Sequence, residues 1–148
     1  MKKINQTILI EKLIQYLATN YSLYLKTQNF HWNITGAEFI SLHRFFQEQY
    51  EELAEAIDLI AEQIRTFGVI TPGSFSEFSK LSKIKDSIGK KNFKKMLSEL
   101  INDHLLIVKL TKELLAIAIE HHDEVRQDLL INRLKSHEKN IWMLRSFG

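Results

Sequence analysis

Cysteine is absent from this chain, and the residues that most often interrupt helices are scarce. With no cysteine among 148 residues, disulfide scaffolds, thiolate metal sites and cysteine nucleophiles are excluded. Proline occurs once and glycine five times, so few positions force a helix to end. A hydrophobic fraction of 45% with charges of both signs is typical of globular proteins. The composition predicts a single folded domain over residues 1–148.

Long apolar runs are also absent. No segment approaches the roughly 18 consecutive apolar residues of a membrane-spanning helix. Near the N-terminus, Asn5, Gln6 and Glu11 interrupt the apolar residues, unlike the continuous core of a secretory signal. The sequence therefore predicts a soluble, cytoplasmic protein that has no membrane partner.

The chain has strong helical periodicity instead. Apolar residues recur at three- and four-residue steps through residues 7–34, 38–67, 93–120 and 123–147. Ser74 and Glu77 have the spacing of a capping box, which predicts a short helix between the second and third long segments. Residues 1–6 precede the first periodic segment and are predicted to form a short tail. The pattern predicts an all-α fold, a four-helix bundle with a short extra helix in that connection.

Four side chains with metal-binding chemistry lie within residues 31–62, namely His31, His43, Asp58 and Glu62. At about 100° per residue, His43, Asp58 and Glu62 share one face of the predicted second helix. The rise along that helix separates His43 from Asp58 by roughly 22 Å, too far to share an ion. An antiparallel copy would place His43 opposite the two acids of the other subunit, and two-fold symmetry would create two identical sites. The spacing predicts metal binding at a homodimer interface.

Three stretches of the chain resemble the Dps family of miniferritins. They are NFHWNITG at residues 29–36, FISLHRFFQEQYEELAEAIDLIAEQI at residues 39–64, and DLLINRLKSHEKNIWMLRSF at residues 128–147. The resemblance implies a ferritin-like bundle that assembles into a hollow homododecamer. It also implies a stress-response ferroxidase that oxidises Fe²⁺ with H₂O₂ or O₂ and stores the ferric iron. In the family pattern, the ligands His31 and His43 of one subunit face Asp58 and Glu62 of its two-fold mate.

One position departs from that family pattern. The family usually has an acidic residue one turn after the second histidine, where this chain has Gln47. An amide is a neutral and weaker ligand than a carboxylate, so Gln47 puts the second iron position in doubt. Glu51, one helical turn further along, either supplies a substitute carboxylate or is a solvated or arginine-paired interface residue.

Two acids near the last helix are candidates for an iron entry route. Asp123 and Asp128 match the positions that line the three-fold pore in the Dps family, where three copies of each would attract Fe²⁺. Asp123 has the alternative role of capping the last helix, and Arg126 between the two acids weakens the field. Other aromatic and histidine residues have separate predicted roles. Trp32 packs in an interface or intercepts oxidising equivalents as the family's tryptophan does, and Trp142 belongs to the core. Among the histidines, His104 is structural, His121 and His122 are solvated, and His137 lies on the surface or at an interface.

Seven lysines gather in residues 80–95 with a single acid, Asp86, giving a local charge of +6 in a chain whose net charge is +2. Repeated around a shell, this segment would form a basic surface for sequence-independent DNA binding, and a solvated loop is the alternative. The lysines are Lys80, Lys83, Lys85, Lys90, Lys91, Lys94 and Lys95.

Two functions follow from these patterns. The first is an iron-oxidising and iron-storing miniferritin that removes Fe²⁺ and hydrogen peroxide. The alternative is a shell protein with ferroxidase activity impaired by Gln47, which acts mainly in DNA protection.

Overall fold

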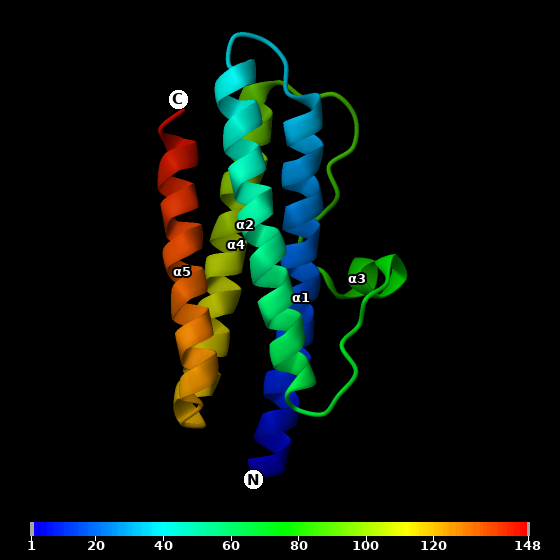
Figure 1. The fold of residues 1–148 in the computed structure, drawn as a ribbon, viewed down its shortest axis with the longest axis vertical. Helices are drawn as coiled ribbons and strands as arrows, with labels where there is room; N and C mark the ends of the chain where they lie inside the picture. The colour runs from blue at the N-terminus through cyan, green and yellow to red at the C-terminus, as the bar shows by residue number, and fades with distance from the viewer. Residues whose placement is uncertain (1, 148) are drawn as a thin grey trace.

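The computed structural model describes residues 2–147, with side chains from residue 6 onward. Four long helices lie side by side and a short fifth helix lies outside them (Figure 1). No strand occurs in the described part of the chain, so the predicted all-α bundle with one extra helix is confirmed. The helices are α1 (Lys2–Asn33), α2 (Phe39–Arg65), α3 (Phe75–Leu81), α4 (Phe93–Glu120) and α5 (Glu124–Arg145).

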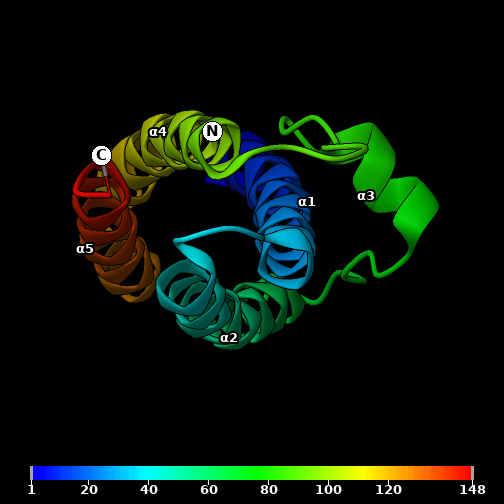
Figure 2. The same ribbon diagram turned by 90° about the horizontal axis from the view of Figure 1, so that it is seen from above.

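The long helices form two hairpins that enclose one core. Seen from above, α1 and α2 are neighbours, α4 and α5 are neighbours, and α1 also packs against α4 (Figure 2). Phe30, Phe46 and Leu53 are among the side chains that fill the centre with almost no exposed surface. Burying a side chain of this size stabilises the fold by about 1.5–3 kcal/mol. Within residues 2–147, no helix combines the length and apolar character needed to cross a lipid bilayer.

Helix boundaries agree closely with the sequence prediction except at the N-terminus. Because α1 begins at Lys2, residues 2–6 are helical, not the tail predicted for residues 1–6; Met1 lies outside the described residues. Residues 2–35 contain no proline or glycine, so no residue of these two types interrupts α1 in its first turns. Gly36 and Gly68 follow α1 and α2 with φ angles of +97° and +81°, a left-handed conformation that favours glycine.

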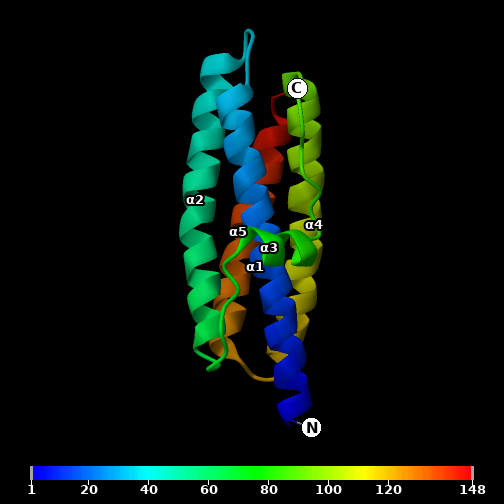
Figure 3. The same cartoon turned by 90° about the vertical axis from the view of Figure 1, so that its right-hand side faces the viewer.

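The connection from α2 to α4 crosses the length of the bundle on the outer side of α1 (Figure 3). As predicted, Ser74 caps α3: its Oγ accepts from the Glu77 backbone N–H at 3.3 Å and donates to Glu77 Oε1 at 2.6 Å. Two hydrogen bonds tie the connection to α1. Asn29 Nδ2 donates to the Ser87 carbonyl at 3.1 Å, and the Lys83 N–H donates to Thr19 Oγ1 at 3.1 Å.

A buried polar network joins α2, α4 and α5 in the interior. Arg133 pairs with both carboxylate oxygens of Glu52 and donates to His137 Nε2 at 3.3 Å. His137 must therefore carry its proton on Nδ1, which lies 2.8 Å from His104 Nδ1. Burial, with a smaller contribution from Arg133, lowers the pKa of His104 to about 3. Burial, His104 and Arg133 together lower the pKa of His137, so both imidazoles are neutral at neutral pH.

Two predictions for side chains of α5 are wrong. His137, predicted on the surface or at an interface, is fully buried inside the chain, and Trp142, predicted in the core, exposes 66% of its surface. The inward stripe of α5 contains Leu130, Arg133 and His137 together with Ile141 and Leu144. Because two of these five positions are polar, apolar periodicity alone does not reveal the inner face of the helix.

Candidate metal centre

His31 and His43 meet where the α1–α2 hairpin closes. His31 lies in the last turn of α1 and is buried, whereas His43 lies near the start of α2 and is partly exposed. Their rings stack with centroids 3.8 Å apart and planes inclined by 18°. The turn at residues 34–38 thus brings together two of the four predicted ligands within one chain.

Each of the two imidazoles is held by the backbone of the other residue. His31 Nδ1 lies 2.7 Å from the His43 carbonyl oxygen, and His43 Nδ1 lies 2.8 Å from the His31 carbonyl oxygen. A carbonyl only accepts, so both Nδ1 atoms carry a proton. With the proton on Nδ1, the neutral form of either imidazole has its lone pair on Nε2, and this is the form that binds metal ions.

Aromatic rings hold this histidine pair on both sides. Phe39 stacks on His43 with centroids 4.9 Å apart, and the edge of Tyr50 meets His31 at 5.1 Å with an interplanar angle of 73°. Partial burial, followed by the charge of Glu51, raises the pKa of Tyr50, so its phenol keeps its proton at neutral pH. Tyr50 was not among the predicted site residues, although its spacing of seven residues from His43 places it on the same helical face.

Asp58 and Glu62 form a second group of predicted ligands further along α2. They are four residues apart, both are exposed, and neither forms an ion pair with a described residue of this chain. Because α2 is unbroken from Phe39 to Arg65, His43 and Asp58 remain roughly 22 Å apart along its axis. In the described part of one chain, no three His, Asp or Glu side chains converge on a possible metal position. A single chain therefore presents the predicted ligands in two separate groups.

Gln47 and Glu51 lie on α2 after His43 and are bonded to each other. Gln47 Nε2 donates to Glu51 Oε1 at 2.8 Å. This hydrogen bond holds the exposed Glu51 carboxylate beside Gln47, the residue that stands where the family usually has an acid. Glu51 is paired with the amide, and no arginine pairing is found for it among the described residues.

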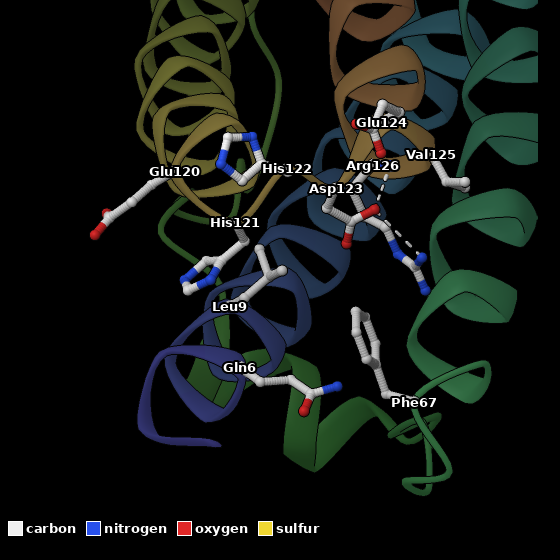
Figure 4. A pocket seen from close by; sticks show the side chains of 10 residues that line it. All are labelled: Gln6, Leu9, Phe67, Glu120, His121, His122, Asp123, Glu124, Val125 and Arg126. Carbon is white, nitrogen blue, oxygen red and sulfur yellow. Dashed lines mark hydrogen bonds and ion pairs between the residues drawn. The ribbon is translucent and has the colours of Figure 1, made fainter. Parts of the chain in front are cut away.

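The two pore candidates differ in their local contacts. Asp123 caps α5, because its Oδ1 accepts from the Arg126 N–H at 3.1 Å, and it also pairs with the Arg126 guanidinium at 3.5 Å. Asp123 lines an open pocket of about 610 Å³ at the α4–α5 turn, where the side chains of His121 and His122 point apart (Figure 4). Asp128 is exposed one turn into α5. The capping role predicted as the alternative for Asp123 is thus confirmed.

Comparisons with known proteins agree with this architecture. A family model described as a ferritin-like domain matches residues 10–147. A DNA protection during starvation protein of Brevibacillus brevis is 32% identical over 147 residues, covering 99% of both chains. An uncharacterised low temperature-induced protein of Nostoc sp. is 39% identical over 140 residues, which cover 93% of this chain and 78% of that protein.

Solved structures give the same assignment. A Dps protein from Vibrio cholerae O1, described as a member of a broad superfamily of ferritin-like diiron-carboxylate proteins, superposes with a TM-score of 0.93. It is 30% identical, and the match covers 97% of this chain and 91% of that one. From the family match, these relatives and the shared fold, we conclude that the chain belongs to the Dps family of ferritin-like proteins.

Proposed function

We propose that this protein oxidises Fe²⁺ and stores the ferric product, with hydrogen peroxide as the oxidant. The observation that carries the proposal is the reciprocal bonding of His31 and His43, which occupies both Nδ1 atoms of the stacked rings and leaves both Nε2 atoms free of these bonds. Imidazole nitrogens combined with carboxylates suit Fe²⁺, a metal of borderline softness. The diiron-carboxylate description of the Vibrio relative supports the same chemistry.

The site is completed by a second subunit. An antiparallel α2 of the partner would bring its Asp58 and Glu62 opposite His31 and His43, and two-fold symmetry would give two sites per dimer. Apolar side chains that are exposed in the single chain lie on the same two helices as the ligands, which is typical of an interface. They are Ile8, Leu25, Trp32, Phe39, Ile40 and Leu59.

Each ligand has a defined role in this proposal. The two imidazoles bind Fe²⁺ without adding charge, and the two carboxylates of the partner neutralise the ion and favour its oxidation to Fe³⁺. Six such dimers form the dodecameric shell, inside which the ferric product accumulates. Asp128, together with Asp123, lines the entry route around a three-fold axis, although Arg126 neutralises part of the Asp123 charge.

Iron oxidation by the purified protein tests the proposal. Anaerobic protein loaded with Fe²⁺ and then given H₂O₂ should develop ferric absorbance well above the rate in buffer, in particles that sediment as dodecamers. Asp58→Ala should reduce the rate to the buffer level while assembly persists. Equal rates in the natural protein and the Asp58→Ala variant would refute this site.

The Gln47→Asp variant examines the second iron position in the same assay. Two Fe²⁺ ions close together repel each other, so the second one depends on nearby negative charge. Aspartate at position 47 should therefore raise the number of tightly held metals per site and accelerate oxidation by peroxide. If the natural protein already binds two equally tight metals per site, the Glu51 carboxylate held by Gln47 is the substitute ligand.

DNA binding is a second candidate function, favoured by the lysine-rich residues 80–95, called here the basic connection. Six of its seven lysines are exposed; Lys91 is partly buried, donates to the Ile88 carbonyl at 2.8 Å and lies 4.0 Å from Glu99. The segment runs from the last turn of α3, which contains Lys80, over the outer side of α1 (Figure 2) to the first turn of α4, which contains Lys94 and Lys95. The Brevibacillus relative is named for DNA protection during starvation, which supports the same role.

DNA binding through this surface should depend steeply on salt and not on sequence, because only phosphates are contacted. Replacing Lys90, Lys94 and Lys95 with glutamine should flatten the salt slope in gel-shift titrations. Replacing Lys109, Lys112 and Lys135, which are exposed outside this segment, is the matched control. An unchanged slope in the first variant would contradict a role for the basic connection.

A further inference from the structure

Three of the four tyrosines form a continuous series of ring contacts that begins at the histidine pair. Tyr50 meets His31 at 5.1 Å, Tyr24 meets Tyr50 at 6.0 Å, and Tyr21 meets Tyr24 at 5.6 Å. These separations are those of aromatic rings in direct contact. Tyr50 belongs to α2, Tyr24 and Tyr21 lie one turn apart on α1, and all three are partly exposed.

The series ends beneath α3. Tyr21 contacts Phe78 with ring centroids 4.9 Å apart, and Phe78 lies on the short helix outside the bundle. Thus the tyrosines connect the buried end of the histidine pair with the outer side of α1, where α3 lies (Figure 3). The fourth tyrosine, Tyr16, is buried in the core and its hydroxyl bonds to Thr111 Oγ1 at 2.8 Å.

From this arrangement we propose that Tyr50, Tyr24 and Tyr21 form an electron-transfer chain that serves the iron site. The proposal rests on the proposed function and addresses its electron balance. Hydrogen peroxide accepts two electrons, whereas one Fe²⁺ supplies one. At a site that holds a single iron because Gln47 weakens the second position, another donor is needed, and the Tyr50 ring is in contact with the ligand His31.

The balanced step is Fe²⁺ + TyrOH + H₂O₂ + H⁺ → Fe³⁺ + TyrO• + 2 H₂O. The O–O bond breaks, Fe²⁺ and the Tyr50 phenol each lose one electron, and the phenolic proton is used to form water. Tyr24 then gives an electron and a proton to the Tyr50 radical, and Tyr21 does the same for Tyr24. A second Fe²⁺ ion with one proton restores the last phenol and becomes Fe³⁺. Both electrons thus come from iron, although only one ion occupies the site.

Without this donor, the same single iron would cleave peroxide into hydroxide and a free hydroxyl radical. Fe²⁺ + H₂O₂ → Fe³⁺ + HO⁻ + HO• uses one electron, and the radical leaves the site. The tyrosine chain therefore keeps the second oxidising equivalent on the protein.

Rapid-freeze electron paramagnetic resonance tests the chain. Assembled protein carrying less than one Fe²⁺ per site is mixed with H₂O₂, and ferric absorbance is recorded in parallel. The natural protein should give a tyrosyl signal, identified by its narrowing in protein made with ring-deuterated tyrosine. Tyr50→Phe, which keeps the ring contacts but has no phenol, should lose most of that signal and release more hydroxyl radical to a spin trap. In Tyr24→Phe the radical should form but remain on Tyr50.

Tyr16→Phe is the matched control, since Tyr16 lies outside the ring series, and its signal should equal that of the natural protein. Iron oxidation with no tyrosyl signal, with an equal signal in Tyr50→Phe, or with a tryptophan signal that disappears in Trp32→Phe would overturn the chain and leave the proposed function intact. Absence of iron oxidation in the natural protein would remove both proposals, and the parallel absorbance record distinguishes the two cases.

Discussion

Refolding a mixture of His31→Ala and Asp58→Ala proteins should restore metal binding that neither variant has alone. In a mixed dimer, one site combines the intact histidines of one subunit with the intact acids of the other, and the second site is doubly damaged. If the subunits mix at random, about one quarter of the natural number of sites should return. The measurement is a metal titration of the refolded mixture, normalised to dimer concentration.

The control for this experiment is a mixture of His31→Ala with His43→Ala, which damages the same half-site in both proteins. This mixture should recover none of the lost sites, because every site lacks one imidazole. No recovery in the first mixture despite normal dimer formation would show that the ligands come together within one subunit. Recovery in the control mixture would show that His31 and His43 do not belong to the same half-site.

Acid should destabilise this protein through the buried pair His104 and His137. Histidines in the unfolded chain titrate near pH 6.5, whereas the folded-state pKa of His104 is about 3 and that of His137 is also well lowered. Below pH 6.5 the unfolded state binds protons that the folded state cannot, so their contribution is complete above this pH and is lost as the pH falls toward 3. The free energy of unfolding should decrease by about 1.4 kcal/mol per pH unit for each histidine. The charged neighbours do not prevent this loss of stability. Arg133, which contacts His137, is itself a cation, and the Glu52 carboxylate is already paired with Arg133.

Denaturant unfolding between pH 7 and pH 4.5 measures this slope. The double variant H104L/H137L should have a flatter pH dependence whatever its absolute stability, because both buried imidazoles are gone. H121N/H122N removes two histidines that solvent reaches at the α4–α5 turn, and asparagine tolerates the left-handed backbone of His122 (φ +54°). This control should retain the natural slope, and a flattened slope in both variants would assign the effect to general loss of histidine.

Local signals in the sequence were sufficient for the helices and for part of the site. The third long segment was predicted at residues 93–120 and is observed as Phe93–Glu120, because Asn92 caps its start and periodicity persists to its end. The shared face of His43, Asp58 and Glu62 follows from helix geometry alone and needs no tertiary information. The intersubunit completion of the site remains a prediction.

Contacts between side chains of different helices could not be predicted from apolar periodicity. The stacking of His31 on His43 depends on how the turn at residues 34–38 closes, and the His104–His137 contact joins helices whose relative rotation is set by the whole core. Trp142 was misplaced for the same reason, since a large apolar residue beside Ile141 gives no indication of which of the two faces inward.

The reciprocal hydrogen bonds between His31 and His43 have a consequence for the free energy of metal binding at the proposed site. The His31 carbonyl is one of the last in α1, where carbonyls lack a helical partner, and the His43 ring supplies that partner. Both rings are therefore immobilised by folding before any ion arrives. Restricting a flexible side chain at the moment of binding costs about 1 kcal/mol. At the proposed site this preorganisation would avoid two such costs, and it makes His43 a cap of α1 as well as a proposed ligand. Any residue that replaced it for a different metal would also have to close the helix.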